Sequence, residues 1–148
     1  MKKKLLLVAC LSGILSVSVF IAKAEISQKA LQSFHLVFAN AKHVKWTEYP
    51  DHYFVSFSQN DVLIKATYDR DGNLLNTLRY YTEQRLPLNV LYQVKNKYPE
   101  KSINIVTEVS DTEGTVYFIQ LKDDKGWMTV KADQNADMEI IEKFMTQK

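Results

Sequence analysis

The chain has 148 residues, and its 19 Lys and Arg side chains against 17 Asp and Glu give a formal net charge of +2. This weak charge provides no basic footprint of the kind that nucleic-acid binding requires, so we expect no nucleic-acid partner. Cys10 is the only cysteine. A single cysteine excludes an intrachain disulfide framework, a thiol redox pair and a multi-cysteine metal site.

The N-terminus has the parts of a secretory signal peptide. Three lysines precede an uncharged apolar stretch from Leu5 to Ile21, and Ala22-Lys23-Ala24 places small residues where signal peptidase cleaves. We expect residues 1–24 to be removed after Ala24 and the protein to be periplasmic or secreted, touching the membrane only before cleavage. An uncleaved anchor is the alternative, which the serines of the stretch disfavour. Lipidation of Cys10 is disfavoured because only five apolar residues precede it.

Signal cleavage would change the charge of the chain. It removes four lysines and no acidic side chain, which leaves 15 basic and 17 acidic residues. The remainder, residues 25–148, contains no cysteine and is long enough for one hydrophobic core. We therefore predict a single domain over 25–148 that is stabilised by its core and not by disulfides.

The first half of this domain is predicted to be one helix followed by four strands. Apolar residues at helical spacing predict a helix from Ser27, which can cap its start, to about Asn40. Alternating side chains predict strands near 44–47, 53–57, 62–68 and 74–81. Between the last two, Asp69-Arg70-Asp71-Gly72-Asn73 is typical of a tight turn, because glycine adopts a positive φ without steric cost.

The second half has the same predicted order of elements. Leu86-Pro87 predicts the start of a helix that runs to about Tyr98, and Pro99 prevents its continuation. Strands are predicted near 103–109, 115–121, 127–132 and 138–143. The segment Asp133–Asp137 takes the place of the first tight turn but has no glycine. We expect Asn135 to adopt the unusual backbone angle there.

The two halves share a pattern of apolar residues. Leu31, Phe34 and Phe38 correspond, sixty positions later, to Leu91, Val94 and Tyr98, and strand residues from Tyr53 to Asp69 correspond, sixty-four positions later, to Tyr117 to Asp133. Such a period indicates a duplicated unit, here about 26–81 and 86–145. Because the link Thr82–Arg85 is short, we expect the two units to form one continuous body. The predicted fold is α+β. It is a tandem repeat of a helix plus a four-stranded antiparallel meander, with both helices packed on one face of a continuous sheet.

Side chains alternate across a strand, so the pattern assigns two faces to this sheet. The face toward the helices is predicted to carry Tyr53, Val55, Phe57, Ile64, Ala66, Tyr117, Ile119, Leu121, Met128 and Val130. The open face then carries apolar and aromatic side chains among polar ones, and our candidate partner-binding residues there are Phe54, Leu63, Phe118, Trp127, Lys65 and Lys131. Such a cluster is typical of an interaction surface. The alternatives are scattered exposed apolar residues or a covering loop.

Several motifs together resemble one family. They are, in order, Phe38-Ala39-Asn40-Ala41, Val44-Lys45-Trp46, Tyr68-Asp69-Arg70-Asp71-Gly72-Asn73, Leu86-Pro87 and Lys97-Tyr98-Pro99. This arrangement is similar to the exported PepSY-like proteins of Bacteroidetes-type bacteria, also called β-lactamase-inhibitor-protein-like (BLIP-like). The resemblance implies a helix-plus-four-strand repeat, export and no known catalytic residues. It also implies, by analogy with inhibitors of similar architecture, that an aromatic-rich open sheet face binds a protein.

Residue patterns for catalysis and metal binding are weak. His35, His43 and His52 lack the spacing of a metal site. Asp69, Asp71 and Asn73 resemble the start of a calcium loop, but no bidentate glutamate follows at the required distance. The serines lack a nucleophile-elbow setting. We therefore expect no catalytic residues, no metal and no cofactor.

The predicted function is that of a non-catalytic exported protein. It would bind a protein or peptide partner of the cell envelope through the open face of its sheet, and inhibition of an enzyme is one form that such binding can take. The alternative is an envelope protein that binds a small ligand or peptide between helix and sheet, for which a cavity of a few hundred cubic ångströms is the usual scale. An unrecognised enzyme is a third and more distant hypothesis.

Overall fold

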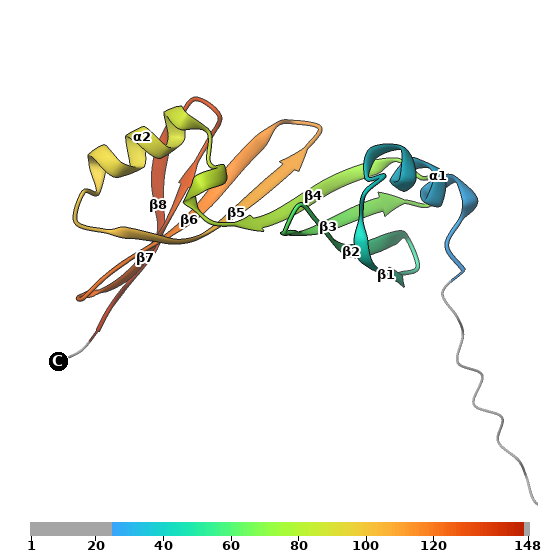
Figure 1. Ribbon diagram of the computed structural model, residues 1–148, viewed down its shortest axis with the longest axis horizontal. Coiled ribbons are helices and arrows are strands. Elements are labelled where there is room, and N and C mark those ends of the chain that lie inside the picture. The colour runs from blue at the N-terminus through green and yellow to red at the C-terminus, as the bar shows by residue number, and fades with distance from the viewer. Residues whose placement is uncertain (1–24, 147–148) are drawn as a thin grey trace, which may run out of the picture.

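The computed structural model describes residues 25–146, so the predicted signal peptide at 1–24 lies outside the described residues. Eight strands and two α-helices form an elongated molecule (Figure 1). In chain order the elements are α1 (Gln28–Val37), β1 (Lys42–Glu48), β2 (His52–Gln59), β3 (Val62–Asp69), β4 (Leu74–Tyr81), the 3-10 helix η1 (Glu83–Arg85), α2 (Leu88–Lys97), β5 (Ser102–Asp111), β6 (Thr115–Asp123), β7 (Gly126–Ala132) and β8 (Met138–Met145).

All eight strands belong to one antiparallel sheet, in which each strand pairs with its neighbours in the chain. The predicted α+β class with one continuous antiparallel sheet is confirmed. The β4–β5 pairing joins the two halves, because Asn76–Tyr81 pair with Val106–Asp111. Helix and strand bounds agree with the predicted ones within a few residues. For example, α1 ends at Val37 because Phe38 already has non-helical backbone angles.

The strand register contains four irregularities, and those of the first strand in each half lie at matching places. In the first strand of each half, β1 has two residues, His43 and Val44, opposite one of β2, and β5 has an extra Asn104. The last strands, β4 and β8, also have extra residues, at Leu75 and Ile141, but these lie two positions apart when the halves are aligned. The agreement between β1 and β5 supports the duplication, which remains a hypothesis. Bulges in β1 and β8 also disfavour edge-to-edge pairing with other chains, because β1 and β8 are the sheet edges.

The hydrophobic core lies on the face of the sheet that the helices cover. All ten residues predicted for the inner face are less than 9% exposed, so their predicted burial is confirmed. Phe34 of α1 and Phe38, the residue that caps this helix, pack on Phe57 of β2, with ring centroids 5.0 and 4.7 Å away. From α2, Val90 and Val94 are buried in the same core cluster. Burial of these large apolar side chains supplies the main driving force for the fold.

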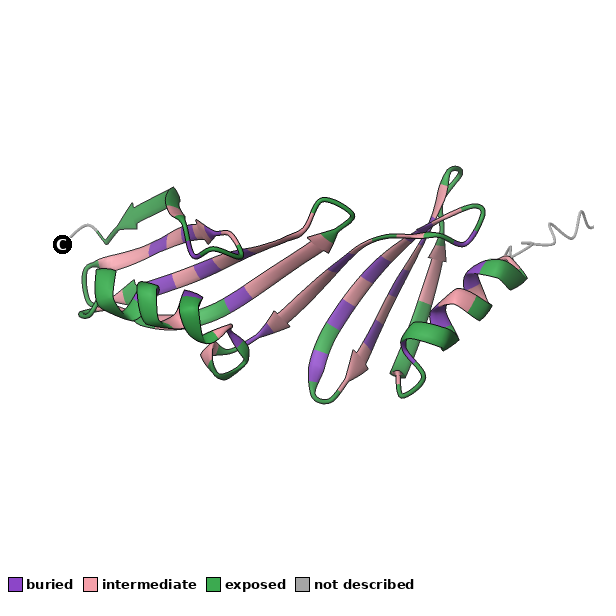
Figure 2. Ribbon diagram, turned by 90° about the horizontal axis from the view of Figure 1, so that it is seen from above, coloured by how far each residue is buried: buried purple, intermediate pink, exposed green. Residues whose placement is uncertain are grey.

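The two helices lie toward opposite ends of the long axis (Figures 1 and 2). The middle of the sheet, formed by β4 and β5, lies between them and is not covered by either helix. Neither helix of the described residues has the length and apolar character needed to cross a membrane. The uncovered middle is where both candidate sites described below are found.

The turn between β7 and β8 corrects one prediction. Ala136, and not Asn135, has the positive φ, at +67°. It occupies the place of Gly72, whose φ is +87°, and both residues donate a backbone hydrogen bond of 3.1 Å to the aspartate three positions earlier. The Asp69 and Asp133 carboxylates each accept a hydrogen bond from the backbone N–H four positions later. The turn geometry therefore decides which position needs a positive φ, whatever residue stands there.

Candidate functional site

The register places the six predicted binding residues on the face opposite the buried core residues. Leu63 is 46% exposed, whereas Phe54, Phe118 and Trp127 are half-buried. Lys65 and Lys131 are half-buried on the same face. The assignment of faces made from the sequence is therefore the observed one. Whether these residues bind anything remains a prediction.

The four apolar members do not form one cluster. Leu63 pairs with Tyr80, Tyr80 with Thr107, and Thr107 with Phe118, so Leu63 and Phe118 lie in one row across β3–β6. Phe54 lies in another row, opposite Thr67 of β3. Trp127 lies toward the β8 edge, where it stacks on Phe144 with ring centroids 4.3 Å apart. The predicted surface is thus divided into a central part and two outlying aromatic residues.

The central part contains residues that the sequence did not single out. Leu78 pairs with Val109, and Val109 pairs with Val116. Together they extend the row into a contiguous surface, here called the central patch, which consists of Leu63, Leu78, Tyr80, Val109, Val116 and Phe118. Five of its members are half-buried and only Leu63 is more exposed. Sequence reasoning missed it because the patch combines β4 with β5, and their pairing joins the two repeats.

Charged side chains border the central patch. The Lys65 ammonium lies 5.2 Å from the centroid of the Tyr80 ring, within the range of a cation–π interaction. Lys131 is opposite Phe118 and forms an ion pair with Glu139 at 3.1 Å. Lys65 is therefore held against the patch by an aromatic ring, whereas the charge of Lys131 is compensated by a carboxylate.

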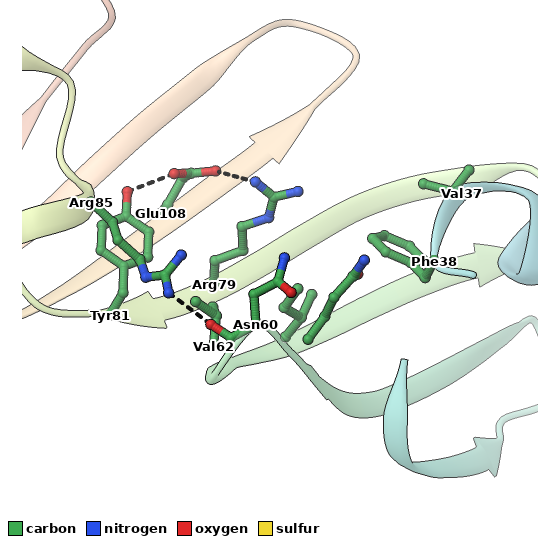
Figure 3. Close-up of a pocket in the computed structure, with 10 residues that line it drawn as sticks. Val37, Phe38, Asn60, Val62, Arg79, Tyr81, Arg85 and Glu108 are labelled. Carbon is green, nitrogen blue, oxygen red and sulfur yellow. Dashed lines mark hydrogen bonds and ion pairs between the residues drawn. The ribbon is translucent and has the colours of Figure 1, made fainter. Parts of the chain in front are cut away.

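A cleft lies on the helix side of the uncovered middle, behind the central patch (Figure 3). Its volume is about 370 Å³. The end of α1, the β2–β3 turn, strands β3 to β5 and the end of η1 surround it, and its lining residues are Val37, Phe38, Gln59, Asn60, Val62, Ile64, Arg79, Tyr81, Arg85 and Glu108. This cleft, here called the inter-repeat cleft, was not among the predicted sites.

A hydrogen-bonded group of three side chains occupies one side of the inter-repeat cleft. The Tyr81 hydroxyl donates to Glu108 at 2.6 Å, and the Arg79 guanidinium lies 3.5 Å from the other oxygen of the same carboxylate. Burial, followed by the hydrogen bond and charge of Glu108, raises the pKa of Tyr81 well above its usual range. Burial and the Glu108 charge also raise the pKa of Tyr117. Both phenols therefore stay protonated at neutral pH.

A second arginine connects the link between the halves to the β2–β3 turn across the cleft. Arg85 of η1 donates to the backbone oxygen of Asn60 at 2.7 Å. Asn60 and Asp61 both have positive φ, which is the geometry of a tight hairpin turn between β2 and β3. In residues 25–146 no cluster of three His, Asp or Glu side chains is placed to hold a metal ion. The cleft thus presents arginines, one engaged carboxylate and apolar walls.

Fold comparison defines the class to which this architecture belongs. The chain has the fold shared by BLIP-like and DUF2874 family proteins of Bacteroides, as the sequence motifs predicted. No protein-family model and no curated protein matches the chain.

Three solved structures illustrate the likeness. A BLIP-like protein from Bacteroides fragilis is 14% identical, with a TM-score of 0.67 over 86% of this chain and 92% of that chain. A candidate periplasmic protein from Bacteroides eggerthii is 13% identical, with a TM-score of 0.61 over 80% and 88%. A DUF2874 family protein from Bacteroides uniformis is 14% identical, with a TM-score of 0.61 over 80% and 88%. At these identities the comparison shows a common fold alone.

Proposed function

We propose that this is a non-catalytic exported protein that binds a protein partner through the open face of its sheet. The observation that carries the proposal is the central patch, a contiguous apolar surface on four adjacent strands that no helix or strand of residues 25–146 covers. Apolar and aromatic side chains that gather on one face and are bordered by lysines are typical of protein interfaces. Export is supported by the predicted signal peptide and by the candidate periplasmic protein of the same fold.

The central residues, rather than Phe54 and Trp127, are expected to dominate binding. Tyr80 and Phe118 flank Thr107 in one row, so both rings can enter the same partner surface. Interface energy concentrates in a few central aromatic anchors, and peripheral contacts contribute less. Trp127 already stacks on Phe144, so one side of its ring is in contact within the molecule and less of it is free to contact a partner.

A site-specific crosslinking experiment tests this proposal. A photo-crosslinking residue replaces Thr107, which lies between Tyr80 and Phe118, and the full chain is expressed and irradiated in its own cell envelope. The crosslinked protein is identified and purified, and its affinity is measured with the wild type and with the double variant Tyr80→Ser/Phe118→Ser. We expect the double variant to raise Kd by about a hundredfold, because two anchors of about 1–2 kcal/mol each are lost.

The helix side of the molecule offers a matched control. Leu88 and Tyr92 of α2 are 82% and 69% exposed, so Leu88→Ser/Tyr92→Ser removes at least as much exposed apolar area from the other face. This control is expected to change Kd by less than about twofold. An equal loss in both double variants, or a crosslink that no purified partner reproduces as saturable binding, would contradict the proposal.

A further inference from the structure

The inter-repeat cleft has features of a ligand site that the open face does not share. It lies on the other side of the sheet, and its volume of about 370 Å³ is within the range of small-molecule sites. Figure 3 shows that its side chains come from both halves, with Val37 and Phe38 on one side and Tyr81, Arg85 and Glu108 on the other. A ligand here would contact the first repeat and the link, and it would lie beside Glu108 of the second repeat.

The charges of the cleft favour a monoanion. Arg79 and Arg85 contribute two positive charges and Glu108 contributes one negative charge. Glu108 is already engaged by the Tyr81 hydroxyl and by one nitrogen of Arg79. The remaining excess of one positive charge suits a single carboxylate, whereas a dianion such as a phosphate would be repelled by Glu108 at close range.

Arg79 has hydrogen-bonding capacity that the protein does not use. Its Nε is shielded from solvent and has no hydrogen-bond partner among the described residues. The separation of 3.5 Å from Glu108 is long for a charge-assisted hydrogen bond. A buried donor without a partner is energetically costly. The Arg79 side chain as a whole is 43% exposed, so a carboxylate in the cleft can accept from its terminal nitrogens in place of the long contact with Glu108.

The opposite wall of the cleft is apolar. Phe38 and Ile64 are buried, Val62 is 7% exposed and Val37 is 52% exposed. An apolar wall beside a cationic one matches a ligand with a carboxylate at one end and a hydrocarbon chain at the other.

We propose that the inter-repeat cleft binds an aliphatic monocarboxylate, with the carboxylate held by Arg79 and Arg85 and the chain against Val37 and the exposed edges of Phe38 and Val62. The same chemistry is present in a free aliphatic acid and in the apolar C-terminal residue of a peptide. This inference does not depend on the open face, so loss of partner binding through Tyr80 and Phe118 would leave it intact.

Titration of the isotope-labelled protein with octanoate, followed by backbone amide chemical shifts, tests the proposal. We expect saturable shifts at residues that line the cleft, and no comparable shifts with octanamide, which has the same chain without the charge. A second arm compares acetyl-Ala-Leu with its C-terminal amide. Octanoate binding alone would assign the site to a free acid, whereas tighter binding of the peptide acid would assign it to a peptide C-terminus.

Single variants identify the groups that hold the carboxylate. Arg79→Gln and Arg85→Gln are each expected to raise Kd for octanoate by about tenfold. Lys97→Gln, which removes an exposed cation of α2 away from the cleft, is the matched control and is expected to leave Kd unchanged. Glu108→Gln is expected to lower Kd severalfold, because it removes the negative charge that opposes the ligand.

The Glu108→Gln variant separates ligand binding from a merely structural role, since a structural carboxylate would not strengthen binding when it is removed. Arg85 is exposed, so its variant is expected to fold even if Arg79→Gln does not. The proposal would be overturned by equal binding of octanoate and octanamide, by an unchanged Kd in both arginine variants, or by the absence of saturable shifts.

Discussion

The two halves of this protein build the same backbone around different cores. At four positions where the first half has an aromatic side chain the second half has an aliphatic one, whereas Phe38 and Tyr98, and Tyr53 and Tyr117, are aromatic in both halves. The equivalent pairs are Phe34 and Val94, Trp46 and Val106, Phe57 and Leu121, and Tyr68 and Ala132. The shared features are the bulge of the first strand, the register of the first three strands and the positive-φ turn before the last strand. Register and turn geometry therefore define the unit, and its core tolerates different fillings.

Aromatic packing in the first half is dense. Phe34 contacts Phe57 edge-to-face at a centroid distance of 5.0 Å and Trp46 at 5.3 Å, and Trp46 in turn lies 5.8 Å from Tyr68. Such pairs stabilise a core by more than their buried area alone suggests. The first half should therefore be more sensitive to truncation than the second.

The largest expected effect compares Phe34→Ala with Val94→Ala. Both side chains are at most 1% exposed and hold equivalent positions in α1 and α2. We expect Phe34→Ala to lower the free energy of unfolding by about 3–5 kcal/mol and Val94→Ala by about 2 kcal/mol, because the larger ring leaves the larger cavity. Denaturant unfolding measures both. Equal losses would show that the aromatic core adds no stability beyond that of the aliphatic one.

The second comparison uses two single variants at equivalent turn positions, Gly72→Ala and Ala136→Gly. A Cβ at Gly72 would lie 2.7 Å from the Lys29 carbonyl carbon and 2.8 Å from the Ala30 nitrogen, so Gly72→Ala strains both φ and the start of α1. We expect a loss of about 2–3 kcal/mol, and a gain of about 1 kcal/mol for Ala136→Gly, where an L-residue already has positive φ. Thermal unfolding of both variants measures these changes. No gain in Ala136→Gly would mean that the second turn is relaxed with alanine.

The third comparison concerns Tyr68, whose equivalent in the second half is Ala132. Burial raises the pKa of Tyr68 to about 12. The folded state holds the neutral phenol, so this stabilisation is present below pH 10 and is lost as pH rises toward 12. We expect the wild type to lose about 2 kcal/mol more than Tyr68→Phe between pH 9 and pH 12.

Tyr68→Phe also tests packing at neutral pH. The Tyr68 hydroxyl is buried and has no hydrogen-bond partner within residues 25–146, so its removal should stabilise the protein by about 1 kcal/mol. Denaturant unfolding at pH 7 and at pH 12 gives both values. If the free energy of unfolding fell equally with pH in the wild type and in Tyr68→Phe, the loss of stability above pH 9 would not come from Tyr68.

The smallest effects are expected at the helix starts. The Ser27 side chain accepts a hydrogen bond from the Ala30 backbone N–H at 3.2 Å, whereas Pro87 at the start of α2 offers no side-chain cap. Ser27→Ala should cost about 1 kcal/mol. Pro87→Ser should change stability by less than about 0.5 kcal/mol, because the new cap offsets the freedom that the unfolded chain regains. Thermal unfolding checks both variants. A large gain of stability in Pro87→Ser would mean that the missing side-chain cap limits the stability of α2.

Most of the fold was predictable because the helical spacing of apolar residues and the two-residue alternation of the strands are both strong in this chain. Alternation in β2, β3, β6 and β7 separated the inner face from the open one, and all ten predicted core residues are buried. The positive φ of the β7–β8 turn was predicted for Asn135, because asparagine tolerates this conformation better than alanine. The hydrogen-bonded turn instead requires it at Ala136, whose backbone N–H donates to Asp133. Local propensity is a weaker constraint than turn geometry at such a position.

The candidate sites were less predictable. Leu63 and Phe118 lie in one row, but Phe54 and Trp127 lie outside the central patch, and Leu78, Tyr80, Val109 and Val116 were not singled out. In β4 the sequence Leu-Leu-Asn-Thr-Leu-Arg-Tyr-Tyr places Arg79 on the helix side and Leu78 and Tyr80 on the open side, opposite to the usual distribution. Alternation alone cannot assign such a strand to a face, since its polar residue points toward the side that carries the core.

By itself the sequence determined the order of the elements, the inner face of four strands and the fold class, because these depend on periodicity and turn chemistry within a few residues. Only the tertiary structure decided what lies at the junction of the repeats. There the β4–β5 pairing leaves a middle that neither helix covers, with an apolar patch on one face and an arginine-lined cleft on the other. Both sites combine residues far apart in the chain, and their proximity depends on the register between two strands that a helix separates.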